Sequence, residues 1–112
     1  MTSTPSSPDP ASSRQLGPIG DKILFENDHV RIWSVQLQPG QRQPWHKHDL
    51  PYVIVPLTKG KNIMYFDDGR ERETNENPGE VLWREAGIPH ELVNISDWDY
   101  KNVLIEIKTG KA

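Results

Sequence analysis

The feature that most constrains the fold is the spacing of apolar residues, which come in short runs separated by turn-forming residues. The runs are rich in β-branched and aromatic side chains and occupy residues 23–25, 30–37, 52–57, 63–66, 81–83, 91–95 and 103–107. Their lengths suit strands, and no window of about fifteen residues sustains the apolar period of an amphipathic helix. The pattern therefore predicts an all-β chain of about seven or eight strands, forming a barrel or a two-sheet jelly roll.

The segments between the runs carry proline, glycine, asparagine and aspartate, which supply the backbone angles that tight turns need. Asp67, Asp68 and Gly69, between Phe66 and Arg70, predict a hairpin turn. We find no internal repeat and no second domain.

The two ends of the chain differ in composition. Residues 1–20 are rich in proline, serine and threonine and contain almost nothing apolar, so we expect a disordered tail. Residues 21–112 then form a single β-barrel domain, whose folded body runs from Asp21 to Lys108. A chain of 112 residues has room for one small core, and association would help to stabilise it, so we expect a homodimer.

Charge and cysteine content exclude several classes of partner and site. The net charge is -3 with interspersed signs, which leaves no basic stripe for a nucleic acid and no polybasic run for a membrane surface. We see no secretory signal and no stretch of transmembrane length, so we expect a cytoplasmic protein. Because the chain has no cysteine, any metal must be held by imidazole, carboxylate or backbone oxygen.

Two of the four histidines form the sequence His46-Lys47-His48. Residues two apart in a strand face the same side, so both imidazoles could bind one metal ion if they point into a barrel. The pair alone is weak support, and two surface histidines are an equally good interpretation. His29 stands in a turn before an apolar run, and we expect it on the surface and outside any site.

The residues around these histidines resemble the two motifs of the cupin superfamily. The first motif is a glycine, five residues and His-x-His, followed by a glutamate and a second glycine; Gly40 to His48 fits its start. The second motif begins with a glycine and ends in a histidine, three residues and an asparagine. Gly79 to Asn94 fits this motif except that Glu85 replaces the usual proline. The resemblance implies a cupin double-stranded β-helix, or jelly-roll barrel.

The resemblance also implies a metal site. By analogy with the family, His46, His48 and His90 are the ligands of one divalent transition metal inside the barrel. Neutral imidazole suits iron, manganese, nickel, copper and zinc, and no thiolate competes in this chain. Fe(II) is the metal that we expect, with manganese, nickel, zinc and copper as alternatives.

The chain departs from the family at the fourth ligand, because no glutamate follows His48 at the motif spacing. That position is Tyr52 or Val53, and strand parity favours Tyr52 as the inward residue. A phenol with an ordinary pKa near 10 is better suited to donate a hydrogen bond than to bind iron as phenolate. The expected site is therefore a three-histidine site, with Tyr52 as a candidate catalytic residue.

Among cupins, three-histidine iron implies a mononuclear non-haem iron dioxygenase, here acting on a small anionic or enolisable molecule. One alternative is a module that binds a small ligand or metal without turnover. Another is a metal-dependent isomerase or lyase with Glu85 as the general base.

Other residues near the motifs have weaker functional interpretations. Glu85 is a candidate catalytic or histidine-orienting residue, although a surface carboxylate paired with Arg84 is favoured. Arg42 fits a solvated loop better than a substrate contact, and Asn94 fits a turn. The tryptophans that could line a pocket are more often core or interface residues in a small barrel; they are Trp33, Trp45 and Trp83.

Overall fold

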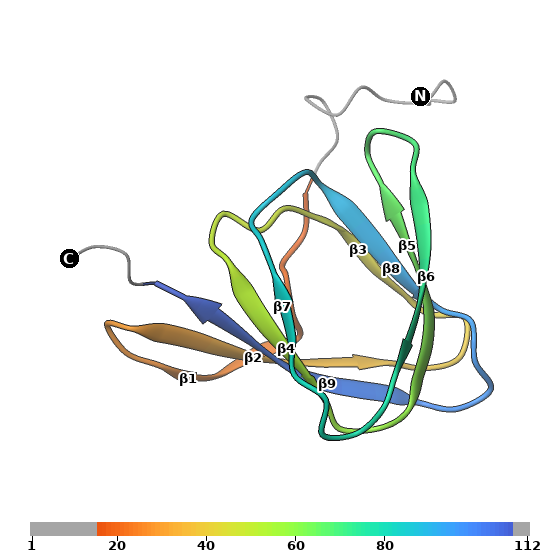
Figure 1. Ribbon diagram of the computed structural model, residues 1–112, viewed down its shortest axis with the longest axis horizontal. Helices are drawn as coiled ribbons and strands as arrows, with labels where there is room; N and C mark the ends of the chain where they lie inside the picture. The colour runs from red at the N-terminus through yellow and green to blue at the C-terminus, as the bar shows by residue number, and fades with distance from the viewer. Residues whose placement is uncertain (1–15, 109–112) are drawn as a thin grey trace, which may run out of the picture.

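A computed structural model describes residues 16–108, which form nine β-strands and no helix (Figure 1). The strands are β1 (Lys22–Glu26), β2 (Val30–Leu37), β3 (Arg42–His46), β4 (Tyr52–Pro56), β5 (Gly60–Phe66), β6 (Glu71–Glu76), β7 (Leu82–Arg84), β8 (His90–Asn94) and β9 (Tyr100–Ile107). In this part of the chain, therefore, no helix is long and apolar enough to cross a membrane.

The strands form two antiparallel sheets that face each other around a common interior (Figure 1). One sheet has five strands in the order β1-β2-β9-β4-β7, and the other has four in the order β3-β8-β5-β6. The chain crosses from one sheet to the other several times, for example between β3 and β4. This arrangement is a two-sheet jelly-roll barrel and confirms the predicted all-β fold.

Two strands, β3 and β6, lie outside the apolar runs. The sequence of β6, ERETNE, is entirely polar, and that of β3, RQPWH, has no run of apolar residues. Each strand nevertheless pairs with a neighbour, β3 with β8 and β6 with β5, and points polar side chains into the barrel. Hydrophobic periodicity cannot find a strand whose inner face is polar.

Glycines at positive φ form three of the turns. Gly69 (φ 93) ends the tight turn between β5 and β6, which confirms the predicted hairpin. Gly40 (φ 80) and Gly79 (φ 89) are the first glycines of the two cupin-like motifs. A side chain at these angles would be strained, which gives a physical reason for glycine there.

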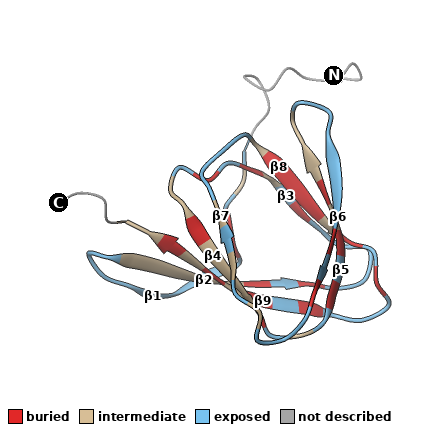
Figure 2. Cartoon of the chain, viewed as in Figure 1, coloured by how far each residue is buried: buried red, intermediate tan, exposed pale blue. Residues whose placement is uncertain are grey.

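The interior holds two small apolar clusters and many buried polar groups. One cluster contains Ile19, Val35, Tyr52 and Leu104, and the other contains Leu37, Met64, Leu92 and Tyr100. Figure 2 shows most of β8 and the adjacent end of β3 as buried. The buried polar residues include the three candidate metal ligands.

The N-terminal residues that the structure describes lie against the barrel. The Gly17 backbone N–H donates to the Trp45 carbonyl at 2.6 Å, and Ile19 is a core residue. We expected these residues to belong to the tail. A single isoleucine and close backbone contact attach this stretch to β3, and neither gives a periodic signal in the sequence. The rest of the expected tail, residues 1–15, lies outside the described residues.

Candidate metal centre

A β-bulge in β3 aims His46 into the barrel. Arg42 pairs with Val93 and Gln43 with Leu92, but the next aligned pair is His46 with His90, so β3 has one extra residue there. The extra residue falls at Pro44 or Trp45, and proline, which lacks an N–H, is tolerated at bulges. The bulge reverses the alternation, so that His46 faces inward directly beside His90.

His48 lies beyond the end of β3, yet it is also buried. Its carbonyl accepts a hydrogen bond from the Gly87 backbone N–H at 3.3 Å, which ties the first motif to the second. The sequence expectation that both histidines face inward is therefore met, but only His46 lies in a strand. Tyr52 begins β4 in the opposite sheet, so simple parity along one strand does not explain its inward position.

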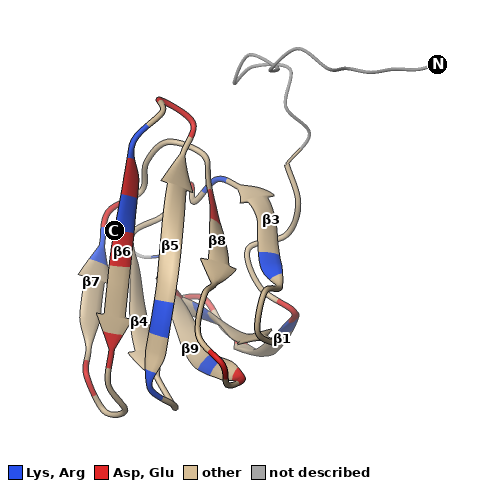
Figure 3. Cartoon of the chain, turned by 90° about the vertical axis from the view of Figure 1, so that its right-hand side faces the viewer, with Lys and Arg blue, Asp and Glu red and all other residues tan. Residues whose placement is uncertain are grey.

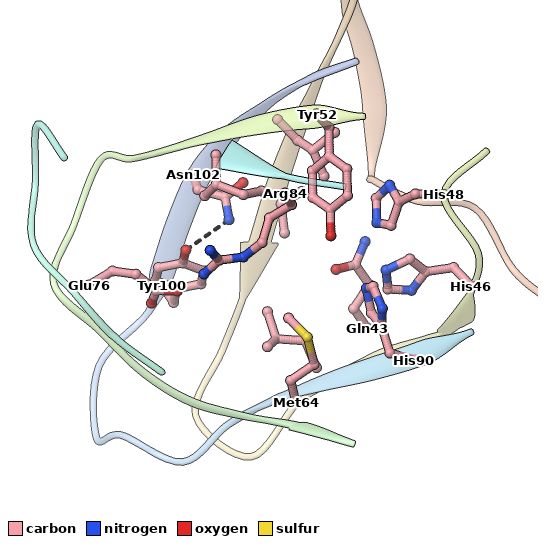
Figure 4. Close-up of a pocket in the computed structure, with 14 residues that line it drawn as sticks. Gln43, His46, His48, Tyr52, Met64, Glu76, Arg84, His90, Tyr100 and Asn102 are labelled. Carbon is pink, nitrogen blue, oxygen red and sulfur yellow. Dashed lines mark hydrogen bonds between the residues drawn. The ribbon is translucent and has the colours of Figure 1, made fainter. Parts of the chain in front are cut away.

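The three candidate ligands converge on one point (Figure 4). Their potential ligand atoms all lie within 4.8 Å of one another. The ring centroids are 4.9 Å apart for His46 and His48, 4.5 Å for His46 and His90, and 5.2 Å for His48 and His90. Within residues 16–108 this is the single cluster of three or more metal-ligating side chains, and it could hold a metal ion.

Burial keeps the histidines uncharged. It lowers the pKa of His46 and lowers the pKa of His48 to about 2, with further repulsion from the neighbouring imidazoles. Burial also lowers the pKa of His90 to about 4. A metal therefore meets three neutral imidazoles and does not have to displace protons from them.

The hydrogen bonds of the histidines fit a bound metal. His46 Nδ1 lies 2.7 Å from the Pro44 carbonyl and can donate its proton there, which leaves Nε2 as a free ligand. His48 Nδ1 is buried and has no hydrogen-bond partner among the described residues. Buried polar atoms are normally satisfied, and a bound cation nearby would complete this site. The residues present thus fit the metal that the cupin fold implies.

Tyr52, the candidate that motif spacing and strand parity favour, lies beside the histidines. Its ring stacks on His48 with centroids 3.7 Å apart, and its hydroxyl points into the cavity (Figure 4). Burial raises the pKa of Tyr52 to about 12, against the opposing charges of Arg84 and Arg72. The phenol is therefore protonated at neutral pH and can donate a hydrogen bond.

Two adjoining cavities lead to the site. The central cavity has a volume of only about 30 Å³ and is lined by the three histidines, Tyr52 and Arg84, with Glu76 at another part of its wall. The outer cavity, which we call the vestibule, has a volume of about 310 Å³ and shares Tyr52, Met64, Arg84 and His90 with the first. A small molecule can thus be accommodated beside the histidines but not deep in the barrel.

Glu85 is exposed, as the favoured interpretation expected, but its observed partner is different. Its carboxylate accepts a hydrogen bond from Trp83 Nε1 at 2.6 Å, and no ion pair with Arg84 forms. Because the side chains of Trp83 and Arg84 alternate across β7, Arg84 turns toward the barrel interior. Glu85 also contributes to the vestibule wall.

The other sequence candidates lie away from the histidines. His29 is exposed in the β1–β2 turn, and Arg42 pairs with Glu91 at 2.9 Å. Asn94 is fully buried and holds a turn, donating to the carbonyls of Leu37 and Trp98. Neither cavity is lined by a tryptophan.

Arg72 and Glu76 near the site were not predicted from the sequence, and Arg84 was named only as a surface partner of Glu85. Arg72 and Arg84 line the vestibule, and Glu76 lines the central cavity. Arg72 and Glu76 belong to β6, which the apolar pattern does not reveal. The alternation Arg72, Thr74, Glu76 could have suggested a strand with a polar inner face.

Comparison with known proteins agrees with this geometry. Residues 36–109 match the family described as the AraC-like ligand binding domain. The "Beta-alanine degradation protein BauB" of Pseudomonas aeruginosa is 31% identical over 86 residues, which cover 77% of this chain and 90% of that protein.

Solved structures show the same fold. A cupin domain from Bordetella pertussis has 30% sequence identity and a TM-score of 0.73, covering 79% of this chain and 91% of that one. A cupin superfamily protein from Desulfitobacterium hafniense has 18% identity and a TM-score of 0.60, covering 94% of each chain. The chain therefore belongs to the AraC-like ligand-binding domain family and has the cupin fold.

Proposed function

We propose that this protein is a metal-dependent cupin enzyme, a mononuclear non-haem Fe(II) dioxygenase that acts on a small anionic or enolisable molecule. The observation that carries the proposal is the convergence of three buried, neutral imidazoles without a carboxylate. The ring of Tyr52, the candidate for the position of the missing glutamate, stacks on His48.

The donor set supports this chemistry. Three neutral ligands leave a divalent cation its full charge and open coordination positions, so a bound iron would supply sites for an anionic substrate and dioxygen. His46 is oriented by the Pro44 carbonyl, and His48 is oriented by stacking on Tyr52. The protonated Tyr52 hydroxyl is placed to donate a hydrogen bond to a substrate oxygen.

The named relative supports a small carboxylate as substrate. BauB is named for the degradation of β-alanine, a small molecule that carries a carboxylate. The vestibule volume of about 310 Å³ lies at the lower end of the range for small-molecule sites.

Metal analysis and oxygen uptake test the proposal together. We expect one metal per chain after anaerobic loading with Fe(II), and we expect His48→Ala to lose it. His29→Ala is the matched control because His29 is exposed and remote from the cluster. Oxygen uptake is then measured with thiols, β-diketones and hydroxylated aromatic acids. A metal-loaded protein that consumes no oxygen with any of these classes would count against a dioxygenase.

A ligand-binding module without turnover is the second candidate function, and the family match favours it because that family is described by ligand binding. It predicts compounds that raise the melting temperature and are recovered unchanged in the presence of metal and oxygen. The isomerase or lyase alternative requires Glu85 as a base. Unaltered turnover in Glu85→Gln would reject that role.

A further inference from the structure

We propose that the vestibule binds a second anionic group of the substrate, so that the site selects small dicarboxylates over monocarboxylates. This inference rests on the proposed function in one respect: the first anionic group is expected at the histidine cluster. The observation behind it is a pair of inward-pointing arginines, Arg72 and Arg84, that line the vestibule.

Strand register places both arginines on the inward face of their strands, where Arg84 is half-buried and Arg72 remains exposed. Arg72 on β6 lies opposite Met64 on β5, and Arg84 on β7 lies opposite Tyr52 on β4. Directly paired residues of antiparallel strands share one face of a sheet. Because Met64 and Tyr52 are buried and line the cavities, the two arginines point the same way. Figure 3 shows the positive segments of β6 and β7, and Figure 4 shows the guanidinium of Arg84 inside the cavity.

The ion pairs found among the described residues involve Arg31, Arg42, Arg70 and two lysines, and not Arg72 or Arg84. Arg84 is half-buried, and its one hydrogen bond is to the Trp83 carbonyl at 3.3 Å. Arg72 is exposed and lies over the Phe66 ring, 5.6 Å from its centroid. A third arginine of the vestibule, Arg70, differs because Asp68 neutralises it at 2.8 Å.

The charge of Arg84 lowers the pKa of Glu76, but the two side chains form no direct ion pair. Glu85 is engaged by Trp83 Nε1, and Glu76 lies at the central cavity, where it accepts a hydrogen bond from Asn62 at 3.0 Å. Arg84 is half-buried and Arg72 is exposed at the vestibule wall, so an anion that enters the vestibule can approach both guanidinium groups. The planar guanidinium fork matches the geometry of a carboxylate.

The two arginines are close enough to the histidine cluster for one molecule to reach both. Arg84 lines the central cavity together with all three histidines, and Arg72 shares the vestibule with His90 and Tyr52. A dicarboxylate can thus place one carboxylate at the histidines and the other at the arginines. A monocarboxylate leaves one of these positive regions without an anion.

Calorimetric titration tests the inference. Nickel-loaded and metal-free proteins are titrated with malonate, succinate and glutarate, with propionate as the monocarboxylate. For the nickel-loaded protein, we expect the best dicarboxylate to bind at least about tenfold more tightly than propionate. Arg72→Gln and Arg84→Gln should each weaken dicarboxylate binding about tenfold or more and change propionate binding less than about twofold.

Lys61→Gln is the control, because it removes one positive charge from the exposed outer face of β5. It should leave dicarboxylate binding unchanged, and Arg84→Lys should restore only part of the affinity. Melting curves establish that each variant is folded, and metal content establishes that the cluster is intact. A dicarboxylate that binds no better than propionate, or equally well to both arginine variants, overturns the inference.

The experiment also distinguishes failure of the metal-dependent function from failure of the anion site. If no metal binds, the metal-dependent proposal fails, and the metal-free titration alone decides whether the vestibule binds anions. Dicarboxylate binding that both arginine variants weaken supports the anion site. Binding that neither variant changes, or no binding at all, overturns it.

Discussion

Glu76 is a buried carboxyl group that no cation pairs with among the described residues. Its side chain accepts a hydrogen bond from Asn62 at 3.0 Å, and Arg84 lies in the same cavity beyond ion-pair distance. Burial raises the pKa of Glu76 above its ordinary value of 4.5, and this effect exceeds the opposing hydrogen bonds and the opposing charge of Arg84. The folded protein therefore binds the Glu76 proton more tightly than the unfolded chain does.

We expect Glu76→Gln to stabilise the protein at neutral pH and not in acid. A raised folded-state pKa means that the stability contributed by protonated Glu76 is fully present below about pH 4.5 and is lost as the pH rises through the folded-state pKa. Glutamine keeps the hydrogen bond from Asn62 and cannot ionise. The melting temperature of the variant should exceed that of the wild type by a few degrees at pH 7, and the two should converge near pH 4.

Glu73→Gln is the matched control for this prediction. Glu73 lies on the same strand but on the exposed outer face. Its substitution should leave the melting temperature unchanged at both pH values. A Glu76→Gln variant that is destabilised equally at pH 4 and pH 7 would show that ionisation of Glu76 does not limit stability.

Tyr52 has two separable roles at the site, stacking and hydrogen bonding. Tyr52→Phe keeps the ring that stacks on His48 at 3.7 Å and removes the hydroxyl. We expect unchanged metal content and, if the protein is a dioxygenase, a loss of about tenfold or more in kcat, the scale of one hydrogen bond in a transition state. Metal loss in Tyr52→Phe would instead mean that the hydroxyl helps to hold the metal.

At the scale of the strands, the sequence reveals those with an apolar inner face and misses those with a polar one. Val30–Leu37 is predicted with its observed bounds because it joins an apolar core to an apolar outer face. The buried residues of β3 and β6 are polar, namely Gln43, His46, Thr74 and Glu76, so hydrophobic periodicity does not identify these strands. The histidines are found through the glycines around them, whereas the bulge that aims His46 leaves no signal in sequence periodicity.

Gly60, at the start of β5, lies in close contact with Glu76 of β6 and Tyr100 of β9. A Cβ on Gly60 would contact Glu76 Oε1 and would lie 2.7 Å from Tyr100 Cε1, and Tyr100 is fully buried. Because the ring cannot move aside, we expect Gly60→Ala to lower the free energy of unfolding by about 1–3 kcal/mol. Urea unfolding measures this loss. Gly87→Ala is the control, since the nearest atom to its Cβ would be 3.9 Å away; an equal loss in both variants would contradict the packing explanation.

At the scale of the whole molecule, the outer face of the five-stranded sheet is unusually apolar. Paired residues form one row across all five strands, and they are Phe25, Ile32, Ile105, Val53 and Trp83. Phe25 and Trp83 at the two ends of the row are 53% and 52% exposed. An antiparallel sheet with a solvated outer face normally alternates apolar inward with polar outward residues. This row therefore resembles an interface more than a free surface.

This row is the candidate interface of the homodimer that the small size of the chain predicts. Two copies related by a twofold axis can cover the row with itself, because a twofold interface uses the same patch on both chains. We expect the wild type to sediment as a dimer at micromolar concentration and Val53→Lys, at the centre of the row, to sediment as a monomer. Ile63→Lys is the matched control on the outer face of the other sheet, where the introduced lysine would lie opposite Glu73. A wild type that stays monomeric contradicts the dimer, and a dimer that survives Val53→Lys but not Ile63→Lys moves the interface to the four-stranded sheet.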